Sequence, residues 1–338
     1  MNELVKRNHQ IYLLEYHEYG NILDDKYIVD PGIQTIFIDR RDFKTYNDYS
    51  DEMHNVISGI HPDVMIAVMW PNFERLLKFT QGLDIPIIAS DHSSFYSNTS
   101  EHKKDVRYNL YKQADAVVVL TTCDQELMKD YLQNTVVIYN PLSFPRLNQK
   151  TSREKTVLCA GRLAVYKIKG FDLMIDIWGQ IAHKHPDWTL KFAGDYQNTD
   201  TSELERLIDD NQVRDSVEFL GWRDDIEDLM KSSAIFALPS RDEGFPCVLM
   251  EAMAQGCTPV AFEIYGNIRE MITDGQDGFI IPNGDLAGFA EKLDILMDNV
   301  DLRERLGRSA IESVERFEPE RIVDQWESLL LDVIEKKK

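Results

Sequence analysis

The fold of this chain is decided by the stretch Asp242-Glu243-Gly244-Phe245-Pro246-Cys247-Val248-Leu249-Met250-Glu251-Ala252-Met253. The preceding residues 234–238 form a continuous apolar run, which is typical of a short buried strand. Residues 247–255 carry apolar side chains at helical spacing. The stretch therefore predicts a strand, a turn that contains Glu243, and a helix that contains Glu251.

A turn of this kind is a favourable place for a ligand. Open α/β sheets bind ligands at the carboxyl ends of their parallel strands. The free backbone N–H groups and the dipole of a helix start also attract anions. A simpler interpretation is that Glu243 complements the helix dipole and Glu251 lies on a solvated helix face. Residues elsewhere in the chain decide between the two.

Composition excludes several classes of protein. The 338 residues, 43% of them hydrophobic, suffice for two α/β domains with separate cores. A net charge of −21 argues against nucleic acid as a partner. No apolar run is long enough to span a bilayer, residues 1–10 lack a signal-peptide core, and the cysteines show no metal-ligand spacing. We expect a cytoplasmic protein, at most peripheral to the membrane.

The pattern of the first part of the chain predicts a parallel, doubly wound sheet, because apolar runs alternate with helical patterns. The expected strands are residues 11–16, 34–39, 64–70, 86–90, 116–121 and 136–139, with helices at 49–57, 73–80 and 103–113. The segment Asn140 to Pro145 then interrupts the alternation. We therefore place a first domain at residues 1–145.

A second alternating series predicts a second doubly wound sheet. Its expected strands are residues 156–160, 189–193, 217–220, 235–238, 259–262 and 278–281, with helices at 171–183, 202–211, 226–232, 248–254, 268–272 and 286–298. We assign this domain to residues 146–317. A last helix at 319–335 is longer than a simple end-cap requires, so residues 318–338 are expected to cross back onto the first domain.

Two cations follow neighbouring strand ends of the second domain. Arg162 comes just after an expected strand, and Lys169 opens the next helix. An arginine fork and a lysine point charge at adjacent turns can converge on one phosphate, although either alone is more often a surface cation. Gly194, Gly221 and Gly266 follow other strands, so all these turns should line one crevice edge.

In this order, the motifs of the chain resemble the family 4 retaining glycosyltransferases. They are Gly161-Arg162-Leu163, Lys169-Gly170-Phe171, Phe219-Leu220-Gly221, Glu243-Gly244-Phe245-Pro246, Glu251-Ala252-Met253 and Asp274-Gly275 with Gly278-Phe279. The Glu-x7-Glu pair is the signature of that family, and the ordered motifs cover nearly all of residues 156–326. More loosely, Ala89-Ser90-Asp91-His92-Ser93 resembles the family's strand that ends in a histidine facing the donor sugar.

The resemblance implies a GT-B fold, in which two Rossmann-like domains face each other. The second domain would hold a nucleotide diphosphate sugar, with UDP as the expected nucleotide by analogy, and the first would hold the acceptor. The implied reaction is transfer of a hexosyl group, with retained anomeric configuration, to a glycan or lipid-linked acceptor in surface polysaccharide synthesis.

The resemblance also implies roles for individual residues. Arg162 and Lys169 would stabilise the departing diphosphate, Glu243 would bind sugar hydroxyls, Glu251 the ribose, and His92 would face the donor sugar. The remaining donor-binding residues would be Gly161, the backbone N–H groups of Gly244, Phe245 and Cys247, and the turn at Gly221 and Trp222 beside the nucleobase. Since no Asp-x-Asp motif stands at a strand end, we expect no metal and no other cofactor.

Three alternatives remain open. A sugar-nucleotide epimerase of the same fold would bind the same donor without an acceptor. A glycosidase would place two carboxylates across a sugar, but hydrolysis leaves no phosphate for Arg162 and Lys169 to neutralise. A non-catalytic partner protein would bind the nucleotide sugar only.

The chain departs from the family pattern in two places. Family members begin with a strand, a Gly-rich turn and a helix, whereas residues 3–11 resemble the inside of that helix. We therefore expect a gap beside the strands at 11–16 and 64–70, with unpaired backbone groups and exposed apolar side chains. We also expect a first domain that unfolds early, and poor transfer activity. Residues 263–268 also stand where the family usually has a small, Gly-rich loop.

Overall fold

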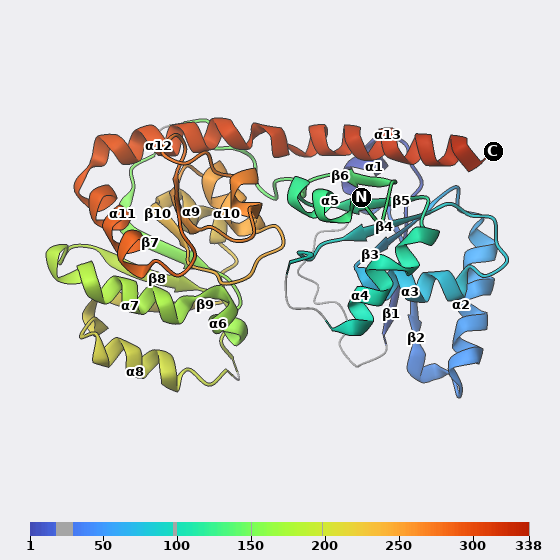
Figure 1. Ribbon diagram of the computed structural model, residues 1–338, viewed down its shortest axis with the longest axis horizontal. Coiled ribbons are helices and arrows are strands. Elements are labelled where there is room, and N and C mark those ends of the chain that lie inside the picture. Colours follow the sequence, from blue (N-terminus) through green and yellow to red (C-terminus); the bar gives the residue numbers. More distant parts are fainter. Residues whose placement is uncertain (18–29, 97–99, 150, 198, 338) are drawn as a thin grey trace.

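The computed structural model describes residues 1–17, 30–96, 100–149, 151–197 and 199–337. It contains two α/β domains that lie side by side, each built on parallel strands flanked by helices (Figure 1). The α/β class and the two-domain organisation predicted from the sequence are thereby confirmed.

The second domain contains one continuous parallel sheet in the order β12-β11-β10-β7-β8-β9. Its strands are β7 (Glu154–Ala160), β8 (Thr189–Ala193), β9 (Val217–Gly221), β10 (Ser233–Leu238), β11 (Thr258–Phe262) and β12 (Phe279–Ile281), so all six expected strands are present. The strand order reverses between β7 and β10, and ligands bind at such a switch point. The turns after these two strands carry Arg162 and Glu243.

Helices cover both faces of this sheet, which is why its central strands are continuous apolar runs. The helices are α6 (Tyr166–Lys169), α7 (Phe171–Ile181), α8 (Ser202–Asp210), α9 (Ile226–Ser232), α10 (Cys247–Ala254), α11 (Leu286–Asp298) and α12 (Val300–Ser313), with short 3₁₀ turns at Leu163–Val165, Ala182–Lys184, Arg214–Ser216, Asn267–Glu270 and Val314–Phe317.

One expected helix of this domain was wrong, and one helix was missed. The helix expected at 268–272 is the 3₁₀ turn Asn267–Glu270. Helix α12 was not predicted, because its buried residues are Leu306, Gly307 and Ala310, and two of these are too small to form a visible apolar stripe.

The first domain is divided differently. Its strands are β1 (Tyr12–His17), β2 (Gln34–Asp39), β3 (Met65–Val68), β4 (Ile87–Asp91), β5 (Ala116–Val119) and β6 (Thr135–Val137). Strands β3-β4-β5-β6 form one parallel sheet and β1-β2 a separate parallel pair, so within the described ranges no pairing joins β1 to β3. The separation falls where the sequence predicted a gap.

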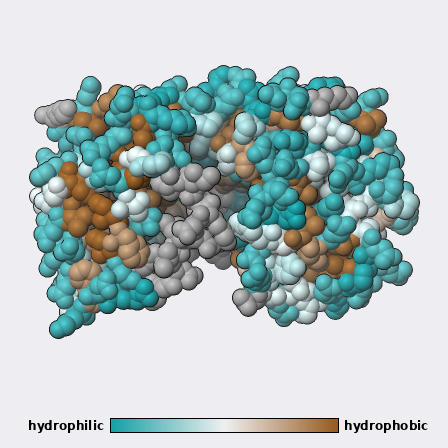
Figure 2. Space-filling view, turned by 180° about the vertical axis from the view of Figure 1, so that it is seen from behind, coloured by the Kyte–Doolittle hydropathy of each residue, from teal (hydrophilic) through white to brown (hydrophobic). Residues whose placement is uncertain are grey.

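Apolar side chains are exposed on the strands beside this separation. Phe37 of β2 is 50% exposed, and Ile66 and Val68 of β3 are 39% and 46% exposed. Figure 2 shows hydrophobic residues gathered on the first domain, at the left of that view. Ile66 lies opposite Ile88 of β4 in the sheet register, and Ile88 is fully buried, so the apolar face of this sheet is exposed toward β3.

The helices of the first domain are α1 (Asn2–Lys6), α2 (Tyr46–Ile60), α3 (Trp70–Phe79), α4 (Glu101–Tyr108) and α5 (Thr122–Met128), with 3₁₀ turns at Arg40–Asp42 and Leu110–Gln113. The strand expected to reach Trp70 ends earlier, because Met69 has a φ of 72° and Trp70 opens α3. Helix α5 was not predicted, although Thr121 caps it by accepting a hydrogen bond from the backbone N–H of Asp124.

The last helix, α13 (Pro319–Lys337), runs along both domains (Figure 1). Its apolar stripe, which includes Leu330 and Val333, packs with Ile88 and Val118 of the first domain's sheet. An ion pair of 2.8 Å between Arg7 and Glu327 joins it to α1. None of the helices among the described residues is both long and apolar enough to cross a membrane.

Candidate active site

The structure brings Lys169 and Glu243 into contact. Lys169 ends α6, and Gly170 follows with a φ of 68°, where a side chain would overlap the carbonyl oxygen of Pro239. The turn after β10 therefore packs directly on the end of α6. The ammonium nitrogen of Lys169 lies 2.8 Å from Glu243 Oε1, and the two side chains are 20% and 10% exposed. A cation and a carboxylate thus share one small, mostly buried space at the switch point.

The Glu243 turn is held by polar residues from neighbouring strand ends. Ser240 Oγ donates a hydrogen bond of 2.8 Å to Glu243 Oε1. The side-chain amide of Asn267, after β11, donates to the backbone oxygens of Glu243 and Gly244 at 3.1 and 2.8 Å. Neither Ser240 nor Asn267 was among the site residues predicted from the sequence. Their signal was a polar side chain at the end of a buried strand.

Two acceptor oxygens beside this turn lack donors. Asp242 Oδ1 and Asn267 Oδ1 are buried without a hydrogen-bond partner in the part of the chain that the structure describes. Burial, with the charge of Glu243 second, raises the pKa of Asp242. Buried acceptors are normally paired, so unpaired ones suit a ligand that brings hydroxyl donors. The site therefore combines a phosphate-binding type of cation with acceptors for hydroxyl groups.

Arg162 lies beside Lys169 at the end of β7. The aliphatic part of the Lys169 side chain passes over Gly161, where an added Cβ would lie 3.4 Å from Lys169 Cδ. Arg162 is exposed, and its guanidinium has no hydrogen-bond or ion-pair partner among the residues described, although its backbone oxygen accepts a hydrogen bond from Val165. Its guanidinium is therefore available to an anion bound next to Lys169.

His92 approaches the site from the first domain. It follows β4, and its Nε2 lies 3.1 Å from Ser90 Oγ. A Cβ added to Gly244 would lie 2.9 Å from the carbonyl oxygen of His92, so the loop after β4 abuts the Glu243 turn. Burial lowers the pKa of His92, and the charge of Asp91 opposes this effect. Burial therefore favours a neutral imidazole at this position.

The other predicted residues of α10 and its turn contact the segment between the domains. The ring of Phe245 stacks on Tyr139 with 5.6 Å between centroids, and Cys247 Sγ accepts a hydrogen bond of 3.3 Å from Asn140. Glu251 is hydrogen-bonded to Ser143, and burial raises the pKa of Glu251.

Gly221 and Trp222 stand at the rim of the site. They end or follow β9, which is the outermost strand of the sheet. Trp222 is exposed, and its indole N–H donates to Asp224 at 2.8 Å. The structure therefore places this predicted nucleobase turn on the same sheet edge as Lys169 and Glu243 but several strands away.

One contact between the domains was not anticipated. Glu270, in the 3₁₀ turn after β11, accepts hydrogen bonds of 2.8 Å from the backbone N–H of Thr122 and from the hydroxyl of Tyr139. Thr122 begins α5, so the carboxylate of one domain caps a helix of the other. Nothing in the local sequence shows this, because the partners are more than 130 positions apart.

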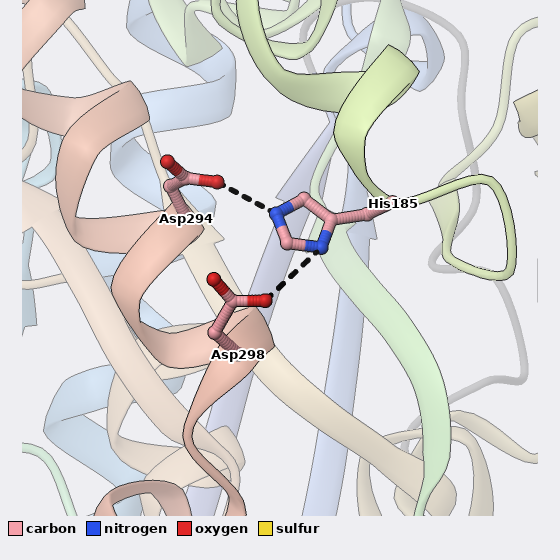
Figure 3. A group of neighbouring side chains, drawn as sticks. All are labelled: His185, Asp294 and Asp298. Atoms are coloured by element: carbon pink, nitrogen blue, oxygen red, sulfur yellow. Dashed lines mark hydrogen bonds and ion pairs between the residues drawn. The ribbon is translucent and has the colours of Figure 1, made fainter.

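A group of potential metal ligands lies away from this site. His185 Nε2 is 2.6 Å from Asp294, and its Nδ1 is 3.7 Å from Asp298 (Figure 3). Lys184 also contacts Asp294, at 2.7 Å. The two ring nitrogens face different carboxylates, which suits an ion-pair cluster better than shared coordination of a metal. His185 precedes β8, at the amino-end edge of the sheet, so the cluster is on the opposite side from Lys169.

Comparison with known families identifies the chain. The family model described as Glycosyl transferases group 1 matches residues 154–299, and the one described as Glycosyltransferase Family 4 matches residues 1–143. The fold and the site agree with these matches. The chain belongs to glycosyltransferase family 4.

Several curated proteins are similar in sequence. An uncharacterised glycosyltransferase of Haemophilus influenzae is 27% identical, over 85% of this chain and 81% of that protein. The amylovoran biosynthesis glycosyltransferase AmsD of Erwinia amylovora is 28% identical, over 72% of this chain and 70% of that protein. An α-1,4-N-acetyl-D-galactosaminyltransferase of Campylobacter jejuni, which acts on a diNAcBac-PP-undecaprenol glycan, is 27% identical over 75% and 70%.

Solved structures show the same fold. Sucrose-phosphate synthase from Thermosynechococcus elongatus has a TM-score of 0.82 at 19% identity, covering 99% of this chain and 92% of that one. Anabaena HepE in complex with UDP has a TM-score of 0.76 at 21% identity, covering 89% and 87%. S. aureus TarM in complex with UDP has 0.72 at 20%, and this chain spans 58% of that longer chain. The architecture is GT-B, as the sequence predicted.

Proposed function

We propose that this protein is a retaining glycosyltransferase. It moves a hexosyl group from a nucleotide diphosphate sugar, most simply a UDP-sugar, to a glycan or lipid-linked acceptor in surface polysaccharide synthesis. The observation that carries the proposal is the contact between Lys169 and Glu243 at the switch point of the second sheet. A phosphate held by that lysine has its attached sugar within reach of the carboxylate.

Lys169 and Arg162 stabilise the leaving group. Negative charge grows on the departing diphosphate in the transition state, and fixed cations that meet it there lower the barrier. Lys169 exchanges Glu243 for the diphosphate, and the guanidinium of Arg162, which has no other partner in the described residues, binds the same group. No carboxylate-held metal is needed for this step.

Side-chain oxygens that accept hydrogen bonds bind the sugar and the ribose. Once Lys169 turns to the phosphate, Glu243 is free to accept from sugar hydroxyls, together with the unpaired oxygens of Asp242 and Asn267. Glu251 exchanges its bond with Ser143 for the ribose. His92 borders the reacting centre from the acceptor side as a neutral imidazole.

The proposed donor and acceptor are inferred from the names of similar proteins. AmsD and the Campylobacter jejuni enzyme are named for polysaccharide and lipid-linked glycan synthesis, and HepE and TarM were crystallised with UDP. These names support a UDP-sugar and a glycan or lipid-linked acceptor for this chain.

One observation favours a second function. The sheet of the first domain is split, whereas the donor side is complete. A protein that binds nucleotide sugar without transferring it, as a partner of an active enzyme, would have this asymmetry.

Thermal shift against a panel of UDP-, GDP- and ADP-sugars tests donor binding. Product analysis with an undecaprenyl-diphosphate-linked glycan then tests transfer, and NMR of the new linkage gives its anomeric configuration. The proposal expects stabilisation by one nucleotide class, acceptor-dependent release of the nucleotide, and retained configuration. Stabilisation without any product favours the binding protein, and a product with inverted configuration contradicts the mechanism.

A further inference from the structure

A buried ion pair lies directly beneath the loop that carries His92. Asp91 ends β4 and is 2% exposed, and Arg107 of α4 is 1% exposed. Arg107 Nε donates a hydrogen bond of 2.8 Å to Asp91 Oδ2, which also accepts one of 3.0 Å from the hydroxyl of Tyr111. None of these three residues has a role in the function proposed above.

Both charges of the pair hold the residues that follow His92. The two terminal nitrogens of Arg107 donate to the backbone oxygens of Ser94, at 3.1 Å, and Ser93, at 2.6 Å. Asp91 Oδ1 accepts from the backbone N–H and the hydroxyl of Ser93 at 3.1 and 2.7 Å. The ring of Phe95 covers the guanidinium, with 3.8 Å between Arg107 Cζ and the centroid of the ring. The loop is therefore tied to fully buried groups at consecutive residues.

The same loop is the surface on which the Glu243 turn rests. A Cβ on Gly244 would lie 2.9 Å from the oxygen of His92 and 3.1 Å from the nitrogen of Ser94. Gly244 does not have a positive φ, so its backbone conformation does not require glycine. The close approach of the two domains requires it. A displacement of residues 92–94 would therefore move both His92 and the contact with the donor-binding turn.

We propose that Arg107 is a positioning residue of the transfer reaction. Acting through Asp91 and the carbonyls of Ser93 and Ser94, it fixes the imidazole of His92 and the surface that meets Gly244. The inference rests on the proposed function, because the fixed imidazole matters only if sugar transfer takes place beside it.

The chemistry of arginine explains why this residue type stands here. Its planar fork reaches four acceptors in fixed directions: Asp91 Oδ2, the backbone oxygens of Ser93 and Ser94, and Ser93 Oγ. The single ammonium of lysine cannot reproduce that geometry. Packed apolar side chains would stabilise a domain at least as well as a buried ion pair, which must first lose its hydration. What the pair adds is one defined position for the loop.

The decisive variant is Arg107→Lys, which keeps the charge and loses the fork. Arg153→Lys is the matched control, because Arg153 also donates to three backbone carbonyls, those of Lys231, Ser233 and Gln255, but in the second domain. We expect kcat of Arg107→Lys to fall on the order of 10- to 100-fold, since misplacement of a reacting group by about 1 Å has effects of that size. The KM for the donor should change less than about threefold, because Lys169 and Glu243 hold it.

Ser93→Ala replaces Arg107→Lys as the test if Arg107→Lys does not fold. It removes the hydroxyl that contacts both Asp91 and Arg107, and it changes the packing little. It should lower kcat in the same direction by a smaller factor. If both folded variants keep the wild-type kcat, or if Arg153→Lys lowers kcat as much, the inference is wrong.

A readout without turnover separates this inference from the proposed function. The His92 imidazole, assigned by its loss in His92→Gln, should give one sharp NMR signal in the wild type and a shifted or broadened one in Arg107→Lys. If the wild type transfers no sugar from any nucleotide sugar, the proposed function fails. The NMR comparison then decides the positioning claim, and identical signals in the two proteins overturn it.

Discussion

Both domains are built on parallel strands flanked by helices, but the strands of the second domain form one continuous sheet and those of the first domain form two separate sheets. In the second domain, β7 and β10 are both flanked by strands on each side, and the side chains of Leu158 and Phe236 are fully buried. In the first domain, β3 is an edge strand whose Ile66 and Val68 remain exposed. An edge strand leaves backbone groups unpaired and apolar side chains in water.

The residues proposed for chemistry follow this difference. Arg162, Lys169 and Glu243 all lie in the connections that follow β7 and β10, the two central strands of the continuous sheet. The first domain contributes the loop that carries His92, and the buried ion pair of Arg107 with Asp91 holds this loop in place. The comparison suggests that binding of the donor depends on the second domain, and that transfer depends on how well the first domain keeps its shape.

The largest effect should come from opening a cavity in the continuous sheet. Phe236→Ala removes a fully buried ring of β10, and such changes cost about 3–5 kcal/mol. Hydrogen exchange resolved by peptide should show the loss across the second domain and little change in β3 to β6. Equal losses of exchange protection in both domains would show that they unfold as one unit, and would contradict the separate stability of the two domains.

Removal of a donor-site cation should lower turnover strongly. Lys169→Ala or Arg162→Ala is expected to reduce kcat at least about a hundredfold, because one preorganised charge contributes a few kcal/mol to the transition state. Lys155→Ala is the control, since that lysine forms an exposed pair with Asp187 at the opposite edge of the sheet. Wild-type rates in both Lys169→Ala and Arg162→Ala would remove the phosphate role.

Mild acid should loosen the first domain through His92. Because burial lowers the pKa of His92, the unfolded state binds a proton more readily than the folded state. Stability is therefore lost as the pH falls below the ordinary histidine value of about 6.5. Exchange protection of β4 should decrease between pH 7 and pH 5, and His92→Gln should reduce that decrease. A pH response that His92→Gln leaves unchanged would assign it to other groups.

A change on the exposed edge should have little effect. Val68→Thr alters a side chain that is 46% exposed, and surface substitutions usually change stability by less than about 0.5 kcal/mol. Urea unfolding followed by exchange in β3 and β4 measures it. A loss several times larger would mean that Val68 is covered in solution, and the first domain would then be more complete than its two separate sheets indicate.

No change at all is expected from metal removal. In the proposed mechanism fixed cations neutralise the diphosphate, so transfer should continue in excess EDTA. His185→Ala should also leave transfer intact, because that cluster lies at the far edge of the sheet. Loss of turnover in EDTA that Mg²⁺ or Mn²⁺ restores would contradict the role given to Arg162 and Lys169.

The sequence by itself determined the strands of the second domain and the family of the chain. All six of its strands could be predicted, because strands buried on both faces are continuous apolar runs. Local pattern also placed Arg162, Lys169 and Glu243 at strand ends, and parallel strands bring such ends to one edge. Helix α12 escaped prediction because packing against small residues leaves little periodicity.

Only the tertiary structure decided which of these groups touch. The ion pair of Lys169 with Glu243, the capping of α5 by Glu270 and the hold of Arg107 on the His92 loop join residues between 13 and 148 positions apart. Their partners are set by how the strands order themselves and how closely the domains approach, and neither leaves a periodic trace in the sequence. The separation of β1-β2 from β3, and apolar exposure on the strand at 64–70 beside it, were expected from the family pattern. Only the structure showed that α13 packs against other members of the same sheet, such as Ile88 and Val118.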